Sequence, residues 1–252
     1  MTVDDARGSP EGSEPDAGPA KRGLPLWQET VLLLVIAILL AIVLKVFLVQ
    51  AFYIPSESME PGLIKNDRIL VEKPSYWFGG TPRRGDVIVF KDPGGWLGAE
   101  EAVGPTNPLV RVMAKIGLYP SGGHLVKRVI GVAGDTIHCC NAHGQLVVNG
   151  RPLSEPEVSR GGERCDGPEV DSCTTGWTVG PVPSGDLFVM GDNRAHSADS
   201  AYHLCHPRAV GCGSGPVFVP TSEVVGKVVM LMWPPGRAHL IHRPSGFAAL
   251  TR

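Results

Sequence analysis

The distribution of apolar and polar residues divides the chain into three parts. Residues 1–25 are rich in Gly, Pro, Ser and acidic residues and almost lack large apolar side chains. Such a segment buries too little surface to offset the entropy lost on ordering, so we predict that it is disordered. Residues 26–49 are almost wholly apolar, and from residue 50 onwards short apolar runs alternate with turn-forming segments. This pattern predicts one long apolar helix followed by a β-rich domain.

The apolar run is long enough to cross a lipid bilayer. No residue is polar from Val31 to Leu44, and roughly 20 residues of helix span the hydrocarbon layer. The alternatives are a core helix and a cleaved secretory signal. A cleaved signal begins nearer the first residue and ends in a small-x-small site, whereas this run ends in VFLVQAF. We therefore predict an uncleaved transmembrane helix over residues 26–49. Basic and acidic residues both precede it, so charge does not fix its orientation.

Several short runs after residue 50 have the apolar pattern of β-strands, at residues 67–73, 86–91, 125–132, 145–150, 186–192 and 224–233. Asn149-Gly150 suits a type I′ hairpin turn. Gly-Asp recurs at 85–86, 134–135 and 185–186 before apolar strands, and we interpret it as a turn in which Asp bonds the following backbone. The 32 glycines, 23 prolines and only 6% aromatic residues also favour short strands joined by many turns.

We predict one β-rich domain over residues 50–245 and an uninformative tail over residues 246–252. Three insertions interrupt the domain, at about residues 92–123, 154–180 and 201–215. Four apolar residues of the first insertion have helical spacing: Leu109, Val112, Met113 and Ile116. The net charge is −2 with both signs interspersed, which suggests neither nucleic-acid binding nor steering of acidic substrates.

Two serines lie two positions apart in YIPSESM, residues 53–59, shortly after the apolar run. A serine needs a base to take its proton before it attacks a carbonyl carbon. Eight histidines are present, so a Ser-His-Asp triad is one alternative, but no serine lies in a GxSxG or S-x-x-K motif. A lysine inside an apolar strand, Lys127 in LVKRVIG, is another candidate base. Neighbouring strand residues point to opposite faces, so Lys127 and Arg128 have different environments.

A desolvated lysine can act as a base, whereas an arginine does not deprotonate usefully. Lowering a lysine pKa from about 10.4 to near 8 costs roughly 3 kcal/mol, which apolar burial can supply. A neutral lysine beside a serine hydroxyl is the Ser-Lys variant of the catalytic triad. The alternative for Lys127 is a side chain that extends from a strand edge into solvent. A third polar stretch, GDNRAHSADS at residues 191–200, is by itself a structured turn.

Three motifs, YIPSESMEPGL, LVKRVIGVAGD and VMGDNRAHSADS, occur in this order behind the apolar run. Together they resemble the bacterial type I signal peptidases, membrane-anchored serine proteases that remove leader peptides from exported proteins. The resemblance covers about residues 30–100, 124–153, 181–200 and 216–236. It implies a mostly β, signal-peptidase-like domain outside the cytoplasm, with the N-terminus inside and the plasma membrane between them. It also implies preprotein substrates cut after small residues at the first and third positions before the scissile bond, and neither a cofactor nor a metal.

The resemblance implies roles for residues of this sequence. Ser58, the second serine of the PSxSM pattern, corresponds to the nucleophile, and Lys127 corresponds to the general base. Ser56 corresponds to the hydroxyl that forms the oxyanion hole with the N–H of Ser58; extended residues at i and i+2 share a face, which suits this role. From adjacency alone, Ile54 and Met59 are candidates for lining the small substrate pockets.

The third motif supplies supporting residues. Ser197 corresponds to the serine that hydrogen-bonds the base and fixes its rotamer. Asp192 and Arg128 correspond to a structural ion pair behind the site, and Asp199 to a further acid. The arginine that the family's pattern places two residues after this acid is replaced by Ala201. The partner of Asp199 therefore stays open between Arg194 and Arg208.

The six cysteines become informative once the compartment is assigned. Outside the cytoplasm, Cys165–Cys173 and Cys205–Cys212 are candidate disulfides, and the partners of Cys139 and Cys140 cannot be assigned. Free thiols are an alternative. So is a zinc site formed by His203, Cys205, His206 and Cys212.

Two other functions fit parts of the pattern. A self-cleaving, repressor-like peptidase uses the same Ser-Lys chemistry but needs an N-terminal DNA-binding module, for which residues 1–25 are too short and too polar. A membrane-anchored β domain that only binds a partner would tolerate alanine at Ser58 and Lys127. Membrane lipid is the second expected partner beside preproteins. Tyr76-Trp77-Phe78 and Trp233 are candidates for lipid contact, with core packing as the alternative.

Overall fold

The computed structural model describes residues 25–97, 107, 123–156, 158, 176–204 and 215–251. Several predictions concern residues outside these ranges. They are the disorder of residues 1–24, the helix around residues 109–116, and the pairing of Cys165, Cys173, Cys205 and Cys212. The chain divides into two compact units at residue 40.

The apolar run forms helix α1, Leu26–Phe47. The helix begins directly after Pro25, whose carbonyl accepts hydrogen bonds from the N–H groups of Gln28 and Glu29. Leucine, isoleucine and valine then follow almost without interruption, and Leu26–Val43 is long and apolar enough to cross a membrane. The span was predicted to end at residue 49, but the helix ends at Phe47 and strand β1 begins at Val49.

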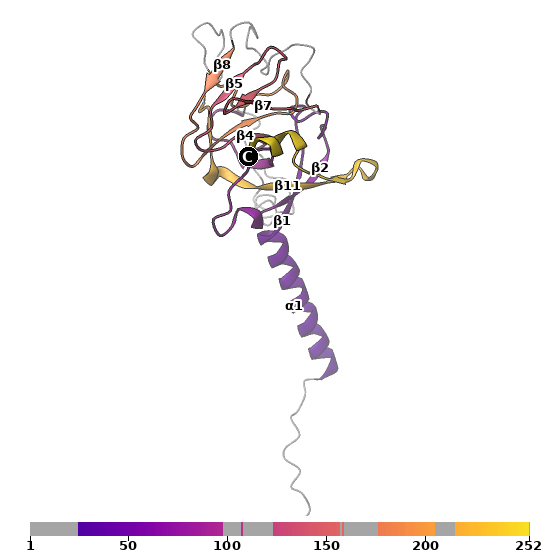
Figure 1. Ribbon diagram of the computed structural model, residues 1–252. Helices are drawn as coiled ribbons and strands as arrows, with labels where there is room; N and C mark the ends of the chain where they lie inside the picture. Colours follow the sequence, from indigo (N-terminus) through magenta and orange to yellow (C-terminus); the bar gives the residue numbers. More distant parts are fainter. Residues whose placement is uncertain are drawn as a thin grey trace, which may run out of the picture. The chain divides into compact units, whose positions relative to one another are not determined.

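The described strands form two antiparallel sheets (Figure 1). The larger has the order β1-β2-β11-β3-β4-β9-β10, with β12 paired to β11. Its strands are β1 Val49–Tyr53, β2 Arg68–Glu72, β3 Val87–Lys91, β4 His124–Gly131, β9 Asp186–Met190, β10 Val219–Pro220, β11 Val224–Trp233 and β12 His239–Leu240. The smaller has the order β7-β6-β5-β8. Its strands are β5 Ile137–Cys139, β6 Val147–Val148, β7 Arg151–Pro152 and β8 Trp177–Val179.

The register of the larger sheet places the candidate base in its interior. Strand β4 lies between β3 and β9, with Lys127 opposite Ile88 and Arg128 opposite both Val87 and Met190. The segment that carries the two serines follows β1, and the third motif follows β9. The sheet thus brings three motifs that are far apart in sequence to one region of the fold.

The turns between strands follow the chemistry of their residues. Asn149 and Gly150 have φ of 50° and 77° between β6 and β7, as a type I′ turn requires. Glycines 85, 134 and 185 all have φ near 86° (86°, 85° and 86°), so the Gly-Asp pairs are turns as predicted. Asp86 and Asp135 differ from the prediction, because each accepts a hydrogen bond from the backbone N–H three residues earlier.

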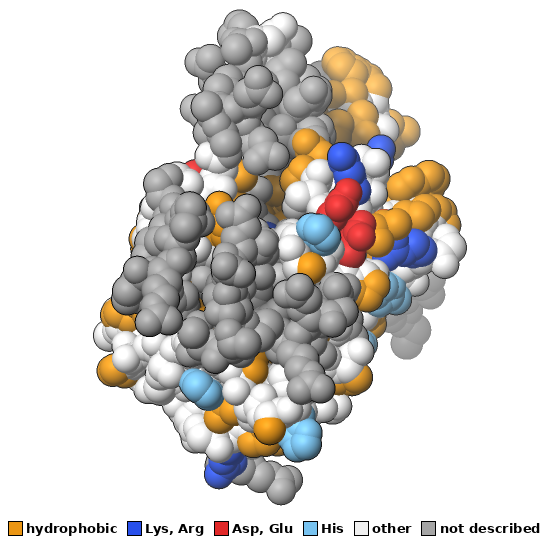
Figure 2. Space-filling model, turned by 90° about the horizontal axis from the view of Figure 1, so that it is seen from above, with side chains coloured by type: hydrophobic (Ala, Val, Ile, Leu, Met, Phe, Trp, Pro, Cys, Tyr) orange, Lys and Arg blue, Asp and Glu red, His pale blue; other side chains and the backbone are white. Residues whose placement is uncertain are grey.

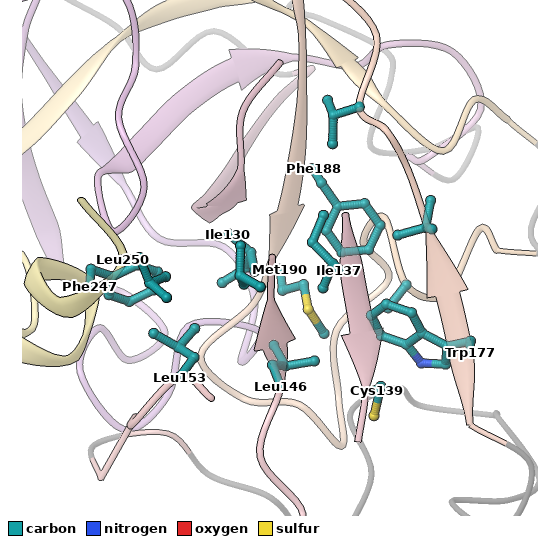
Figure 3. Packing of buried hydrophobic residues seen from close by; sticks show 14 residues of the cluster. Ile130, Ile137, Cys139, Leu146, Leu153, Trp177, Phe188, Met190, Phe247 and Leu250 are labelled. Carbon is teal, nitrogen blue, oxygen red and sulfur yellow. The ribbon is translucent and has the colours of Figure 1, made fainter. Parts of the chain in front are cut away.

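Residues 245–251 are not a tail without structure. They form a 3₁₀ segment, η4 Ser245–Thr251, whose Phe247 and Leu250 are buried in a hydrophobic cluster. Figure 3 shows these two side chains directed towards Ile130 and Leu153, with Trp177 of β8 on the far side of the cluster. Because β8 contributes to this core, the end of the predicted insertion at residues 154–180 belongs to the sheet. The predicted fold class, mostly β behind one N-terminal apolar helix, is confirmed.

Candidate active site

Ser58 and Lys127 are in direct contact. The amine of Lys127 donates a hydrogen bond of 2.5 Å to the hydroxyl of Ser58, and the two residues are only 3% and 5% exposed, respectively. Lys127 comes from the centre of β4. Ser58 lies in a turn in which the N–H of Glu60 donates to the carbonyl of Glu57. The sheet interior therefore holds an amine against a hydroxyl with little water around either group.

Two hydrogen-bond donors lie beside the Ser58 hydroxyl. The hydroxyl oxygens of Ser56 and Ser58 are 3.2 Å apart, and Ser56 is exposed. Among the described residues, no acceptor is hydrogen-bonded to the backbone N–H of Ser58. The Ser56 hydroxyl and the Ser58 N–H are thus two hydrogen-bond donors close to the Ser58 hydroxyl.

The segment after β9 packs directly against the serine turn. The backbone N–H of Asn193 donates to the carbonyl of Ser58 at 3.0 Å, and its side-chain amide donates to the carbonyl of Glu57 at 3.2 Å. A Cβ atom placed on Gly191 would collide with the carbonyl oxygen of Ser58 and with the side chain of Ser197. Sequence reasoning missed both Asn193 and Gly191, although they lie in the GDNRAHSADS motif that it singled out.

The expected contact between Ser197 and Lys127 is not among the hydrogen bonds of the described residues. The hydroxyl of Ser197 donates instead to the carboxylate of Asp199 at 2.5 Å. This carboxylate also accepts hydrogen bonds from the backbone N–H groups of Gly191, at 2.8 Å, and Ala201, at 3.0 Å. Asp199 therefore holds the Ser197 hydroxyl in place.

Of the two candidate partners of Asp199, only Arg194 lies among the described residues, and it binds other groups. Arg194 is fully buried and pairs with Glu155 at 2.7 Å, while its Nε donates to the carbonyl of Gly191. Arg208 lies outside the described residues. Backbone N–H groups and the Ser197 hydroxyl thus bind Asp199 in the described structure.

Arg128 and Asp192 form the expected ion pair. Two parallel hydrogen bonds of 2.7 and 2.6 Å join the guanidinium to the carboxylate, and both side chains are buried. A third N–H of Arg128 donates to the carbonyl of Gly85. The pair therefore ties β4 to the segment after β9 and to the turn before β3.

Ile54 and Met59, the residues predicted to line the substrate pockets, are buried beneath the serine turn. Each is 1% exposed and belongs to the hydrophobic cluster with Phe52, Leu63 and Val126. These side chains pack the core beneath the serine turn, and their place in a substrate pocket stays a prediction.

The cysteine and histidine alternatives are described only in part. Cys139 and Cys140 are joined to each other by a disulfide. The ring of His203 is buried and stacks on Trp96 with centroids 4.7 Å apart. The other three residues of the zinc alternative lie outside the described ranges.

A cavity of about 800 Å³ lies away from this pair. Its lining includes Arg83, Asp186, Arg243 and Phe247 and contains neither Ser58 nor Lys127. The chemistry of the three motifs is therefore not located in this cavity.

The sequence belongs to a known class of peptidase. The sequence profile of the family described as "Signal peptidase, peptidase S26" matches residues 27–233, and the chain belongs to this family of serine peptidases. It is 41% identical to the signal peptidase I of Mycobacterium tuberculosis over 249 residues, which cover 92% of this chain and 81% of the relative. It is 32% identical to the signal peptidase I of Leptolyngbya laminosa over 95% of this chain and 97% of the relative.

A solved structure of a signal peptidase I from Enterococcus faecalis is 25% identical, with a TM-score of 0.33, over 58% of this chain and 95% of that chain. The family resemblance inferred from the three motifs is confirmed by the profile and the relatives, and so is the enzyme class, a serine endopeptidase that removes signal peptides. Helix α1 fits the membrane anchor of such an enzyme.

Proposed function

We propose that this enzyme cleaves preproteins by a Ser/Lys dyad, with Ser58 as the nucleophile and Lys127 as the general base. The 2.5 Å contact between the Lys127 amine and the Ser58 hydroxyl, buried in the sheet, carries the proposal. Burial disfavours the ammonium form of a lysine, because a charge loses its hydration there. A neutral amine can accept the hydroxyl proton, so the position of Lys127 suits a base.

The reaction follows from this geometry. The Ser58 oxygen attacks the carbonyl carbon of the scissile bond while its proton passes to the Lys127 amine. The resulting oxyanion accepts hydrogen bonds from the N–H of Ser58 and the hydroxyl of Ser56. The Lys127 ammonium then gives its proton to the departing amine, which leaves an acyl-enzyme. Water attacks the ester and gives a proton to Lys127; as the intermediate collapses, that proton returns to Ser58 and the signal peptide is released.

Ser197 is proposed to orient the base. Because the hydroxyl proton of Ser197 is directed at Asp199, its oxygen lone pairs remain available to the Lys127 ammonium when that charge forms. Asp192 and Arg128 hold the surrounding segments and have no part in proton transfer.

The proposed cleavage specificity is for small residues at the first and third positions before the cut. It rests on the family resemblance, since Ile54 and Met59 lie in the core. In an extended substrate these two positions share one face, so both side chains meet the same enzyme surface. Shallow pockets would reject large side chains by direct overlap.

The anchor is proposed to confine the reaction to the membrane surface. Leu48 and Ser58 are ten residues apart, which corresponds to at most about 33–36 Å of extended chain. A short tether raises the effective concentration of the enzyme near substrates held in the same bilayer. The proposed topology places the N-terminus in the cytoplasm and the β domain outside it.

Lipid is the second proposed partner, through exposed aromatic side chains. Phe78 is fully exposed, and Trp77 and Trp233 are 37% and 52% exposed. Tyr76 is different, because its hydroxyl bonds Asp86 inside the domain. On the face seen in Figure 2, described basic side chains lie beside acidic ones, an arrangement that gives no support to nucleic-acid binding.

The decisive experiment is cleavage of a synthetic preprotein by full-length Ser58→Ala and Lys127→Ala variants in lipid vesicles. Each is expected to lose cleavage while keeping the circular dichroism spectrum of the wild type, because each removes one half of the dyad. Lys91→Ala, which removes an exposed lysine from the adjacent strand, is the matched control and should cleave normally. Activity of the wild type should rise with pH as the amine of Lys127 deprotonates.

Wild-type processing by Ser58→Ala or Lys127→Ala would refute the dyad, because cleavage would then need another nucleophile or another base. A pH profile that is flat between about pH 6 and 10 would also contradict a lysine base.

A further inference from the structure

One residue holds both peptide units that flank the Ser58 Cα atom. The backbone N–H of Asn193 bonds the carbonyl of Ser58, and its side-chain amide bonds the carbonyl of Glu57. Asn193 is 6% exposed. These contacts reach the Ser58–Met59 peptide and the Glu57–Ser58 peptide, respectively.

The two hydrogen bonds from Asn193 restrain the position of the Ser58 side chain. A peptide unit is planar, so a hydrogen bond to its carbonyl restrains the orientation of the whole plane. The two planes together set φ and ψ of Ser58 and therefore the direction of its Cα–Cβ bond. Asn193 thus helps to restrain the two peptide planes on either side of the Ser58 Cα atom, together with the N–H of Glu60, which also bonds the Glu57 carbonyl.

The side-chain contact has a second effect, on the N–H of Ser58. In a trans peptide the N–H points opposite to the carbonyl, and the Glu57–Ser58 peptide is trans. The amide of Asn193 on the Glu57 carbonyl therefore aims the Ser58 N–H away from Asn193. A hydrogen bond accepted by the carbonyl also polarises the peptide and strengthens its N–H as a donor.

This N–H is bonded to no acceptor among the described residues. We propose that Asn193 is a positioning residue, which sets the oxyanion hole through the Glu57–Ser58 peptide without touching the substrate. The proposal rests on the proposed roles of Ser58 and Lys127.

The test compares full-length Asn193→Ala and Asn193→Asp with the wild type on a synthetic preprotein. Aspartate keeps the shape of asparagine but replaces the donating NH₂ by an oxygen, which repels the Glu57 carbonyl. We expect kcat to fall about 10- to 100-fold in both variants, because small misplacements of reacting groups have effects of this size. KM should change by less than about threefold, since the contact acts in the transition state.

The controls separate positioning from folding. The midpoint of the pH profile should stay unchanged, since the Lys127 amine is not touched. Asn141→Ala is the matched control, because the Asn141 side chain also bonds backbone groups, within a turn of the smaller sheet. It should retain the kcat of the wild type.

Coupling to Ser56 gives an independent readout. If both residues serve one oxyanion hole, Asn193→Ala should reduce kcat by a smaller factor in the Ser56→Ala background than in the wild type. Independent, multiplicative effects would overturn the proposal.

The remaining outcomes distinguish a failure of the role of Asn193 from a failure of the dyad. Wild-type kcat in Asn193→Asp, with Ser58→Ala inactive, overturns the role of Asn193 alone. Loss of folding in both Asn193 variants, or a shifted pH midpoint, shows a general structural role and overturns it too. An active Ser58→Ala enzyme would instead refute the dyad itself.

Discussion

Gly191 allows the third motif to approach the serine turn closely. The space that its side chain would occupy is filled by the Ser58 carbonyl oxygen and by the side chain of Ser197. Neither neighbour is the end of a flexible chain, so the loops would have to separate to admit even one carbon atom. The absence of a side chain at Gly191 therefore lets Ser58 and Ser197 lie close together.

Gly191→Ala is expected to reduce kcat at least tenfold, because separating the loops moves Ser58 relative to Lys127. The measurement is steady-state cleavage of a synthetic preprotein. Gly236→Ala is the matched control, since a Cβ there meets no atom within 4 Å. Equal activity of the two variants would show that the loops tolerate the extra atom.

For single residues, the sequence is informative where a charged residue occurs among apolar neighbours. Lys127 lies among apolar residues, and its predicted burial is confirmed. The roles of Ser58 and Lys127 stay predictions. The partners of Ser197 and Arg194 could not be predicted, because they depend on loop conformations that no local pattern encodes. Ile54 and Met59 were assigned by adjacency, which does not distinguish core from pocket.

Among the elements, the buried Arg128–Asp192 pair connects β4 with the segment after β9. Removing one member of a buried ion pair lowers protein stability, because the remaining charge has lost both its hydration and that partner. The contact between Lys91 and Glu223 is different, at 3.8 Å and with the lysine side chain 63% exposed.

Asp192→Asn is expected to lower the free energy of unfolding by about 3–5 kcal/mol, because it removes the charge of the carboxylate that the buried Arg128 guanidinium binds through two hydrogen bonds. Lys91→Ala should change it by less than about 1 kcal/mol, as for other exposed pairs. Urea unfolding of the two variants, followed by tryptophan fluorescence, provides the comparison. Similar losses in both would argue against a special role for the buried pair.

Long strands can be predicted from the sequence more easily than short ones. Strands β2, β3, β4, β9 and β11 have five or more residues and lie at predicted runs. Strands β5, β7, β8 and β12 have two or three residues, too few to show a period of two. Strand β1 was missed for another reason, because its apolar residues continue those of the preceding helix.

Across the whole domain, Asp86 joins segments from distant parts of the chain. Its buried carboxylate bonds Arg243 at 2.7 Å, Lys227 at 3.1 Å and the hydroxyl of Tyr76 at 3.3 Å. Burial by itself would raise the pKa of Asp86, but the bonds from Arg243 and the backbone and the charge of Lys227 outweigh it and lower the pKa. Burial, followed by the nearby Asp86 charge, raises the pKa of Tyr76.

A carboxylate whose pKa is lowered on folding stabilises the protein above its unfolded pKa, about 3.9, and loses this contribution as pH falls through the folded value. We therefore expect the melting temperature of the wild type to fall steeply below about pH 4. In Asp86→Asn the melting temperature should be lower at neutral pH and less dependent on acid. Melting curves between about pH 2 and 7 provide the measurement, and parallel profiles would contradict the assignment.

The proposed topology is testable in intact cells. A protease added from outside should digest the β domain and leave an epitope fused before residue 25 intact. The same experiment in cells opened by detergent shows that the epitope itself can be cut. Protection of the β domain in intact cells would reverse the orientation.

The docking of residues 245–251 has a consequence for biosynthesis. Phe247 packs on Gly85, whose carbonyl holds Arg128, and the carbonyl of Leu250 accepts a hydrogen bond from Arg84. The structure that supports Arg128 and the turn before β3 is therefore incomplete until the ribosome has added these residues. A nascent chain that already contains Ser58 and Lys127 still lacks this support, so the peptidase is expected to stay inactive until residues 245–251 have been made.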